Sequence, residues 1–255
     1  MDNEMRENDV VIDVDHVSIA YKNVQSISYR AIIKKLFKKG GEGPRSSFKA
    51  IDDVSFQIRR GETVGIVGAN GAGKSTLLGA MAGIYGVDSG EIRVNSDKCS
   101  LLALGVGFQS RLSGYQNIYL SGYAMGFSKE EIDASVDEII AFSELGDFIK
   151  KPVKTYSSGM YSKLAFAISS VLTTEVLLVD ETLSVGDVRF QRKSFERMKE
   201  MINDEKRSVV IVHHATEVLR DLCDRVVWLD HGKLRMIGEA REVLDAYKEF
   251  MIGKK

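Results

Sequence analysis

Residues 68–76 have the types and spacing of a phosphate-binding loop. The run reads Gly-Ala-Asn-Gly-Ala-Gly-Lys-Ser-Thr and satisfies the pattern G-x-x-x-x-G-K-[ST]. Its glycines allow backbone angles that turn successive N–H groups toward one point and make a nest for an anion. We expect Lys74 to reach the β- and γ-phosphates of a nucleotide and the Ser75 hydroxyl to ligate Mg²⁺. The expected nucleotide ligands are Gly68, Asn70, Gly71, Gly73, Lys74, Ser75 and Thr76.

Two acids follow the apolar run of residues 176–179. In nucleotide-hydrolysing enzymes with such a loop, an acid at this kind of strand end holds Mg²⁺, directly or through water, and Asp180 is the candidate. A second acid beside it can orient and activate the attacking water, and Glu181 is that candidate. A pair of surface carboxylates is the alternative. It fits poorly because the apolar residues before the pair indicate a buried strand.

His213 and His214 end a further apolar run, residues 208–212. A histidine at a strand end, beside other nucleotide-binding strand ends, can sense the γ-phosphate, whereas a lone histidine is more often structural. The position directly after the apolar strand favours the functional role for one of the two.

A polar turn also has residue types that suit an anion. Ser157 and Gly159 lie at the end of this turn, before a helix expected over residues 163–172. Serine and glycine at a helix start offer N–H groups and the positive helix end to a negative group. Taken alone the signal is weak, since many helices begin this way.

The elements that must position these residues follow from periodicity. Alternation predicts strands over residues 10–17 and 51–58, and a short continuous apolar run predicts a fully buried parallel strand over 63–67. A helix is expected over residues 76–84, directly after the phosphate loop. Together with 44% hydrophobic and 28% charged residues, this indicates an ordinary α/β chain.

Composition excludes several classes of protein. A net charge of -1 over 255 residues argues against a nucleic-acid binder with a globally basic surface. No apolar run approaches the roughly 18–20 residues of a membrane-spanning helix, and residues 1–15 are too polar for a signal peptide. The two cysteines, Cys99 and Cys223, lack metal-binding spacing and are expected to be buried thiols.

Residues 22–49 form a basic insertion with Glu42 as its one acid. Residues 31–37 could form a short amphipathic helix. One interpretation is a solvated insertion; the other is a surface that lies against anionic headgroups or a membrane partner. Nucleic acid is disfavoured because no stacking aromatic residues interleave the basic ones.

Taken in order along the chain, these motifs resemble the nucleotide-binding subunit of an ATP-binding cassette (ABC) transporter. Residues 68–75 match Walker A and residues 176–181 match Walker B. His214 is the better switch histidine, because it lies ten residues before Asp224, a spacing typical of the family. The other matching motifs are Gln109 as the Q-loop glutamine, residues 157–160 in the place of the signature motif, and residues 184–187 as the D-loop.

The resemblance implies a P-loop NTPase (RecA-like) core with a mostly parallel sheet, an antiparallel β edge and an inserted helical subdomain. It places residues 1–255 in one nucleotide-binding domain. The expected parts are a core over residues 8–108 and 165–240, the helical subdomain over 110–164, the basic insertion over 22–49 and a final helix over 241–251.

The resemblance also implies the cofactors, ATP and Mg²⁺, and ATP hydrolysis as the reaction. The residues it assigns to catalysis are Lys74, Glu181 and His214. Those it assigns to the metal are Ser75, Asp180 and Gln109, which also contacts the nucleotide. Ser157 and Gly159 would contact the ATP of a second copy. Tyr21 resembles the aromatic residue that stacks on adenine, with Phe48 as a competitor and core packing of either as the alternative.

Several stretches are similar to the exporters of polysaccharides such as O-antigen and teichoic acid, namely residues 101–109, 112–122 and 156–160. The chain departs from the general family pattern at Ser158, Met160, Thr182 and Gly186. The exporter subgroup tolerates such changes, so hydrolysis is still expected. No separate glycan-binding domain is expected within the 255 residues.

The implied assembly is a homodimer of nucleotide-binding subunits in an ATP sandwich, with two copies of a polytopic membrane permease. The complex would handle a lipid-linked glycan and no nucleic acid. It would lie peripherally on the cytoplasmic face of the inner membrane. The alternatives are the ATPase of a drug exporter or importer, a soluble ABC ATPase, a GTPase or kinase, and a non-enzymatic cassette.

Overall fold

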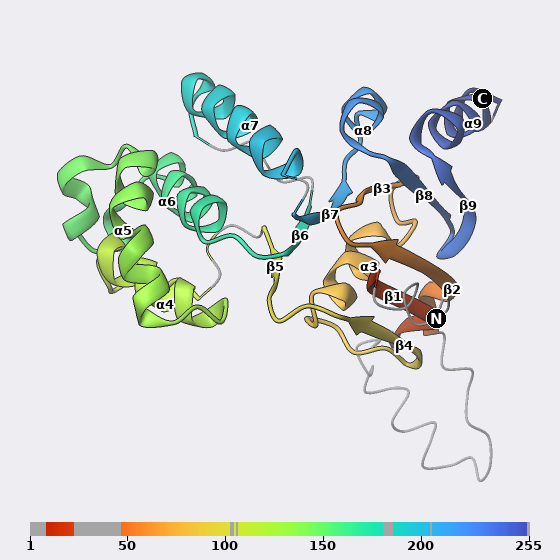
Figure 1. The fold of residues 1–255 in the computed structure, drawn as a ribbon, viewed down its shortest axis with the longest axis horizontal. Helices are drawn as coiled ribbons and strands as arrows, with labels where there is room; N and C mark the ends of the chain where they lie inside the picture. The colour runs from red at the N-terminus through yellow and green to blue at the C-terminus, as the bar shows by residue number, and fades with distance from the viewer. Residues whose placement is uncertain are drawn as a thin grey trace, which may run out of the picture.

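The computed structural model describes residues 9–22, 47–102, 105, 107–180, 186–204 and 206–253. These residues form two β-sheets and a group of helices (Figure 1). Most of the basic insertion lies outside the described residues, as do Glu181, Thr182 and Ser184. What the sequence predicts for them stays a prediction.

The main sheet has the strand order β5–β6–β7–β3–β8–β9. Neighbouring strands run parallel, apart from the antiparallel pair β8 and β9. Every residue of β3, β6 and β7 is buried, as the continuous apolar runs of a covered parallel sheet require. The mostly parallel sheet is therefore confirmed. Its strands are β3 (Thr63–Val67), β5 (Cys99–Leu101), β6 (Val176–Val179), β7 (Ser208–Val212), β8 (Arg225–Asp230) and β9 (Lys233–Glu239).

The second sheet is antiparallel and has the order β2–β1–β4. Strand β1 of this sheet, predicted over residues 10–17, continues to Lys22. The reason is a bulge: His16 and Asp53 have φ angles of 48° and 58°, and the register shifts between Val14 and Val17, after which pairing resumes. The strands are β1 (Val10–Lys22), β2 (Ser47–Arg59) and β4 (Ser89–Val94).

The turn between β8 and β9 forms a tight hairpin. His231 and Gly232 both have positive φ, 49° and 78°, as a type I′ turn requires. The Gly232 N–H donates to the Ala72 carbonyl at 3.1 Å, and the Asp52 N–H donates to the Gly232 carbonyl at 2.8 Å. A Cβ on Gly232 would stand 2.7 Å from the Ala50 carbonyl oxygen. The hairpin tip therefore packs, backbone to backbone, between the phosphate loop and β2.

The helices differ from prediction mainly at their ends. The helix predicted over residues 76–84 lies at 74–81 and ends before Gly83, whose φ is 71°. The helix predicted over residues 163–172 is α6, which begins earlier because Ser157 caps it. The helices are α3 (Lys74–Met81), α4 (Gly114–Ala124), α5 (Lys129–Ser143), α6 (Ser158–Val171), α7 (Val188–Ile202), α8 (Thr216–Leu222) and α9 (Ala240–Gly253).

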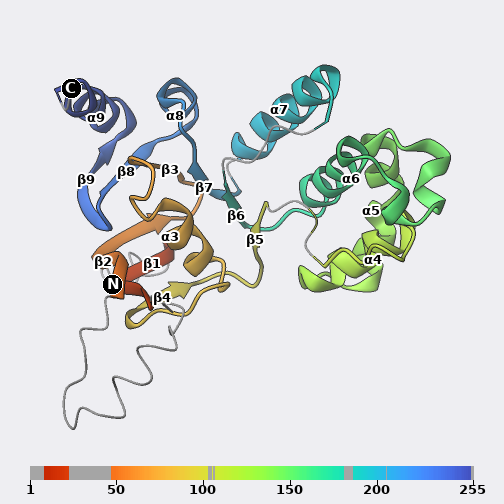
Figure 2. The same cartoon turned by 180° about the vertical axis from the view of Figure 1, so that it is seen from behind.

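Helices α4, α5 and α6 gather at one end of the molecule, and β8, β9 and α9 lie at the other (Figures 1 and 2). The three helices share an apolar cluster that includes Ile118, Ile139 and Leu164. Phe166, also on α6, packs instead with the strands of the main sheet. The boundary expected between the helical subdomain and the core, at residues 164 and 165, therefore falls inside α6. This helix packs against the other helices through one face and against the main sheet through another.

Candidate functional site

The ends of β3, β6 and β7 carry most of the residues that the sequence analysis singles out. β7 lies between β3 and β6, and the three strands run parallel. Their carboxyl ends therefore meet at one edge of the sheet, which is where ligands bind in open α/β sheets. Gly68, Asp180 and His213 directly follow the three strands. The phosphate loop, the first acid and the histidine pair are thus brought together.

A cavity of about 220 Å³ opens beside the phosphate loop. It brings together residues of the loop and the second histidine of the pair. Its volume is below the roughly 300–1,000 Å³ that is typical of small-molecule pockets. The lining residues are Asn70, Gly71, Gly73, Lys74, Ser75, Thr76 and His214.

Glycine is required at position 73 by the backbone conformation and by the lack of room for a side chain. Its φ is 99°, in the left-handed region that favours glycine. A Cβ there would stand 2.3 Å from the Ala50 carbonyl oxygen and 2.7 Å from Ile51 Cδ1. Helix α3 begins at the next residue, so its unpaired first-turn N–H groups belong to residues that line the cavity. This is the arrangement that binds phosphate in loop-and-helix sites.

Lys74 is held inside the loop. Its side chain is buried, and Nζ donates to the carbonyls of Gly68 at 2.8 Å and Ala69 at 3.1 Å. An ammonium has three N–H donors, so a phosphate oxygen can accept the third. Burial lowers the pKa of Lys74, and the negative charge of Asp180 opposes that shift. The amine and the acid after β6 therefore act on each other across the site.

The residues present suit a magnesium–nucleotide complex. Ser75 and Asp180 offer oxygen donors, the kind that Mg²⁺ prefers, and Mg²⁺ is usually held by one or two carboxylates together with substrate phosphates. Within the described residues, no group of three or more His, Cys, Asp or Glu side chains could hold a metal alone. Mg²⁺ bound in this way takes its other ligands from substrate phosphates and water.

The two histidines have different surroundings in the structure. The His213 ring accepts a hydrogen bond from the Ala215 N–H through Nδ1 at 2.9 Å, which caps the start of the following segment. His214 instead lines the cavity with the phosphate loop. This placement favours His214 as the residue that meets the γ-phosphate.

Tyr21 and Phe48 are cross-strand partners in the β1–β2 pair. Directly opposed residues project to the same face of a sheet, and both side chains are exposed, 43% for Tyr21 and 57% for Phe48. The Tyr21 hydroxyl lies 3.2 Å from Thr76 Oγ1, at the start of α3. Either ring can therefore offer an aromatic face beside the phosphate loop, and the choice between them stays open.

Gln109 is held by a residue that the sequence analysis did not assign. The fully buried Asn117 accepts the Gln109 N–H at 2.7 Å and donates to three carbonyls, those of Gln109, Leu112 and Ser113, at 3.1, 3.2 and 2.9 Å. An asparagine inside a helix runs against its local preference, which is the one sequence signal that could have pointed to it. Asn117 fixes the path of the chain from the main sheet into α4.

We expect Asn117→Ala to lower the free energy of unfolding by about 1–3 kcal/mol, because it removes a fully buried amide and its hydrogen bonds to the backbone of Gln109, Leu112 and Ser113. Denaturant unfolding monitored by circular dichroism measures the change. Asn95→Ala is the control, since Asn95 is exposed and the substitution removes the bond from its side-chain amide to the Val10 carbonyl. Equal effects of the two substitutions would contradict the role of Asn117.

The predicted signature turn opens α6. Ser157 is the N-cap, and its hydroxyl accepts the Met160 N–H at 3.2 Å. Met160 is partly buried against the apolar cluster that α4, α5 and α6 share. A Cβ on Gly159 would meet no described atom closer than Ser157 Oγ at 3.9 Å. Packing within the described chain therefore does not require glycine at this position.

The structure does not bring every candidate to the same place. Gln109 precedes α4, Ser157 and Gly159 lie at the start of α6, and none of them lines the phosphate-loop cavity. Ser157 itself is exposed at the start of α6.

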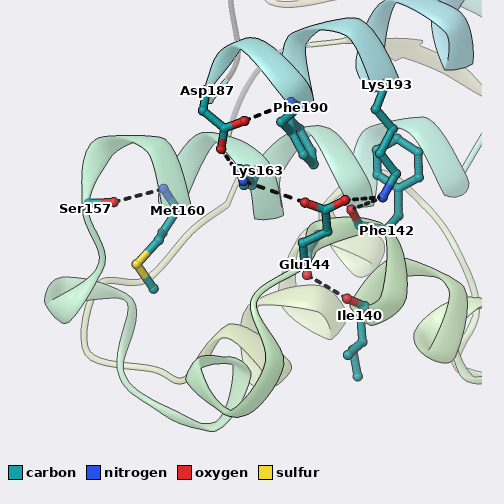
Figure 3. Close-up of polar contacts among 10 residues, drawn as sticks. Ile140, Phe142, Glu144, Ser157, Met160, Lys163, Asp187, Phe190 and Lys193 are labelled. Atoms are coloured by element: carbon teal, nitrogen blue, oxygen red, sulfur yellow. Dashed lines mark hydrogen bonds and ion pairs between the residues drawn. The ribbon is translucent and has the colours of Figure 1, made fainter.

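Asp187, the last residue of the predicted D-loop, caps α7 and forms an ion pair (Figure 3). Its carboxylate accepts the Phe190 N–H at 3.0 Å and lies 2.7 Å from Lys163 Nζ. These contacts lower the pKa of Asp187 to about 2, and the hydrogen bond from Lys163 has the largest effect. Sequence spacing could not predict the pairing of Lys163 with Asp187, because the two residues belong to different helices.

The depressed pKa of Asp187 gives a testable pH dependence. Its contribution to stability is fully present above the ordinary value of 3.8 and is lost only as the pH falls through about 2. In an NMR titration we expect its carboxyl group to remain mostly ionised at about pH 3.5. In Lys163→Met the midpoint should rise toward 3.8. An unchanged midpoint would contradict the assigned cause.

Two known proteins, both named as ATP-binding proteins of export systems, match 95% and 80% of this chain. Teichoic acids export ATP-binding protein TagH of Listeria innocua is 41% identical over 242 residues, which are 95% of this chain and 71% of that protein. O-antigen export system ATP-binding protein RfbB of Klebsiella pneumoniae is 40% identical over 204 residues, 80% of this chain and 82% of that protein.

Solved structures share the fold at lower identity. A dimeric, post-hydrolysis ATP-binding cassette bound to ADP and Pi has a TM-score of 0.67 at 21% identity, covering 90% of this chain and 99% of that one. An ATP-binding subunit of an ABC transporter has a TM-score of 0.69 at 20% identity, covering 93% of each chain. The family model described as ABC transporter matches residues 51–184. The chain therefore belongs to the ABC transporter family and has the P-loop NTPase fold of its ATPase domains.

Proposed function

We propose that this chain is the ATP-hydrolysing subunit of a transporter that exports a lipid-linked cell-surface glycan. The observation that carries the proposal is the near full-length similarity, at about 40% identity, to subunits named for teichoic acid export and for O-antigen export. Both cargoes are large glycans that must leave the cell, so the shared class is export of a lipid-linked polysaccharide.

The residues at the edge of the main sheet account for nucleotide binding. Lys74 and the first turn of α3 would hold the phosphates, and Ser75 and Asp180 would hold Mg²⁺, which neutralises phosphate charge during transfer. Gln109 is proposed as a further contact to metal and nucleotide. Glu181 would take a proton from the attacking water, and His214 would steady the γ-phosphate from the end of β7.

The site is completed by a second copy of the chain. Three observations support this: the cavity is small, the turn at Ser157 is exposed, and packing within the described chain does not require glycine at position 159. Close approach of a phosphate to the backbone would require it. In a two-subunit sandwich, Ser157 and Gly159 of one copy meet the ATP held by the phosphate loop of the other.

The permease is proposed to dock near α4. Tyr115, Tyr119 and Tyr123 form a ladder along this helix, with ring centroids 5.4 and 6.4 Å apart, and the first and last are largely exposed. Asn117, on the same helix, is bonded to Gln109. Movement of a membrane partner on α4 would therefore reach the nucleotide site through one buried side chain.

The chain is proposed to work peripherally on the cytoplasmic face of the membrane. In the described part of the chain, no helix combines the length and apolar character needed to cross a bilayer. The permease would supply the membrane passage, and the basic insertion remains a candidate contact with headgroups or permease.

Depletion in the source cell tests the proposed function. We expect lipid-linked glycan to accumulate on the inner leaflet and to disappear from the surface, with rescue by the wild-type chain but not by Lys74→Met. An unchanged glycan distribution, with ATPase activity confirmed in the purified protein, would reject glycan export.

A further inference from the structure

One ammonium group joins three helices of the structure. Lys163 of α6 lies 2.7 Å from the Asp187 carboxylate, at the start of α7, and 3.8 Å from the Glu144 carboxylate, at the end of α5 (Figure 3). Its side chain is only 16% exposed and lies 5.0 Å from the Phe190 ring centroid. This lysine is therefore packed between elements, unlike a solvated surface lysine.

Each acid is itself fixed by its own helix. Asp187 is the N-cap of α7, and Glu144 ends α5 in the left-handed conformation with φ 56°. Glu144 is also held by Lys193 of α7 at 2.9 Å. Because each acid is fixed at the end of its own helix, the Lys163 ammonium ties α6 to the ends of α5 and α7.

The glycine before Asp187 makes this contact possible. Gly186 has a φ of 73°, and a Cβ there would stand 3.2 Å from Lys163 Cε, 3.3 Å from Lys163 Cγ and 3.2 Å from Phe190 Cδ1. The lysine stem thus lies directly over the turn before α7. Gly186 is one of the positions at which the chain departs from the general family pattern, and the close approach of Lys163 is a physical reason for that departure.

We propose that Lys163 is a positioning residue that couples the signature turn to the turn before α7. Ser157 and Lys163 belong to the same rigid helix, so the pair with Asp187 fixes the direction in which Ser157 and Gly159 face a second copy. Loss of the pair frees α6 to rotate on the apolar cluster beneath it and lowers the fraction of molecules that can close on ATP. The inference rests on the composite dimer site proposed above.

The test measures ATP-dependent dimerisation by analytical ultracentrifugation in the full chain carrying Glu181→Gln, with Mg·ATP as the probe. Lys163→Met should weaken the dimer by about tenfold, within the range of couplings between sites, because each dimer contains two such pairs. Lys163→Arg should restore most of the loss, since arginine keeps the positive charge and can donate to both carboxylates. ATP binding to the monomer should not change.

Two further variants make the test specific. Lys193→Met is the matched control, because Lys193 pairs with the same Glu144 and lies 4.3 Å from the Phe142 ring centroid but belongs to α7. It should leave dimerisation within about twofold of the parent. Asp187→Asn removes the other member of the pair while asparagine still caps α7, and should weaken the dimer as Lys163→Met does.

The outcomes separate the two proposals. A dimer that forms equally well with Lys163→Met and with Asp187→Asn would overturn the coupling and leave the composite site intact. An equal loss with Lys193→Met would also overturn it, because the effect would then reflect general loosening of the helices. Absence of any ATP-dependent dimer in Glu181→Gln itself would overturn the composite site and the coupling together.

Discussion

Lys74→Met is expected to lower the affinity for Mg·ATP by about 100-fold, since a hydrogen bond to a charged partner is worth about 1.5–3 kcal/mol and every 1.4 kcal/mol is tenfold. The amine is buried within the loop and bonded to two of its carbonyls, so no other described side chain lies where it could replace it at the cavity. Isothermal titration calorimetry with Mg·ATP measures the loss.

The control for that substitution is Lys129→Met, which removes an exposed lysine paired with Asp133 on the helical subdomain. Its nucleotide affinity should equal that of the wild type. Affinity for adenosine, which has no phosphates, should be the same in all three proteins. A Lys74→Met protein that binds Mg·ATP normally would remove Lys74 from the phosphate site.

Glu181→Gln is expected to lower the ATP turnover rate by about 10²–10⁴-fold and to trap an ATP-bound dimer, because glutamine cannot take a proton from the attacking water. A phosphate-release assay measures turnover, and size-exclusion chromatography with light scattering measures the dimer. The position of Glu181 directly after Asp180, at the end of β6, is the basis for this expectation.

Asp180→Asn provides the contrast. It removes a proposed metal ligand whose charge acts on Lys74, so it should weaken Mg·ATP binding and give no trapped dimer. Normal turnover in Glu181→Gln would remove Glu181 from the mechanism. Trapping by both variants alike would show that the two acids do not have separate roles.

The sequence predicted the main sheet and the phosphate loop well for a physical reason. Residues 63–67 and 208–212 are short, mostly apolar runs, each directly preceded by a charged residue and followed by glycine or histidine, so the limits of the buried strands coincide with changes in residue type. The start of α6 could not be found in this way. Its first turn is polar and half-exposed, and the cap at Ser157 rather than periodicity determines where it begins.

Contacts between distant parts of the chain were beyond the reach of the sequence. Nothing in the spacing shows that Lys163 meets Asp187, or that Asn117 bonds back to Gln109, because each pairing depends on how helices pack. The same holds for Tyr21 and Phe48, which only the strand register places side by side. The motif chemistry could be predicted, whereas the residues that hold the motifs in position required the structure.

The close packing of the β8–β9 hairpin tip restricts protein engineering of this chain. Hairpin tips are usually favoured points for inserting peptide tags or fluorescent reporters, because loop tips tolerate added residues. Here the Gly232 N–H is bonded to the Ala72 carbonyl, inside the phosphate loop, and its own carbonyl is bonded to Asp52. An insertion at this tip would therefore pull on the nucleotide site, and a reporter placed there would change the activity that it was meant to follow.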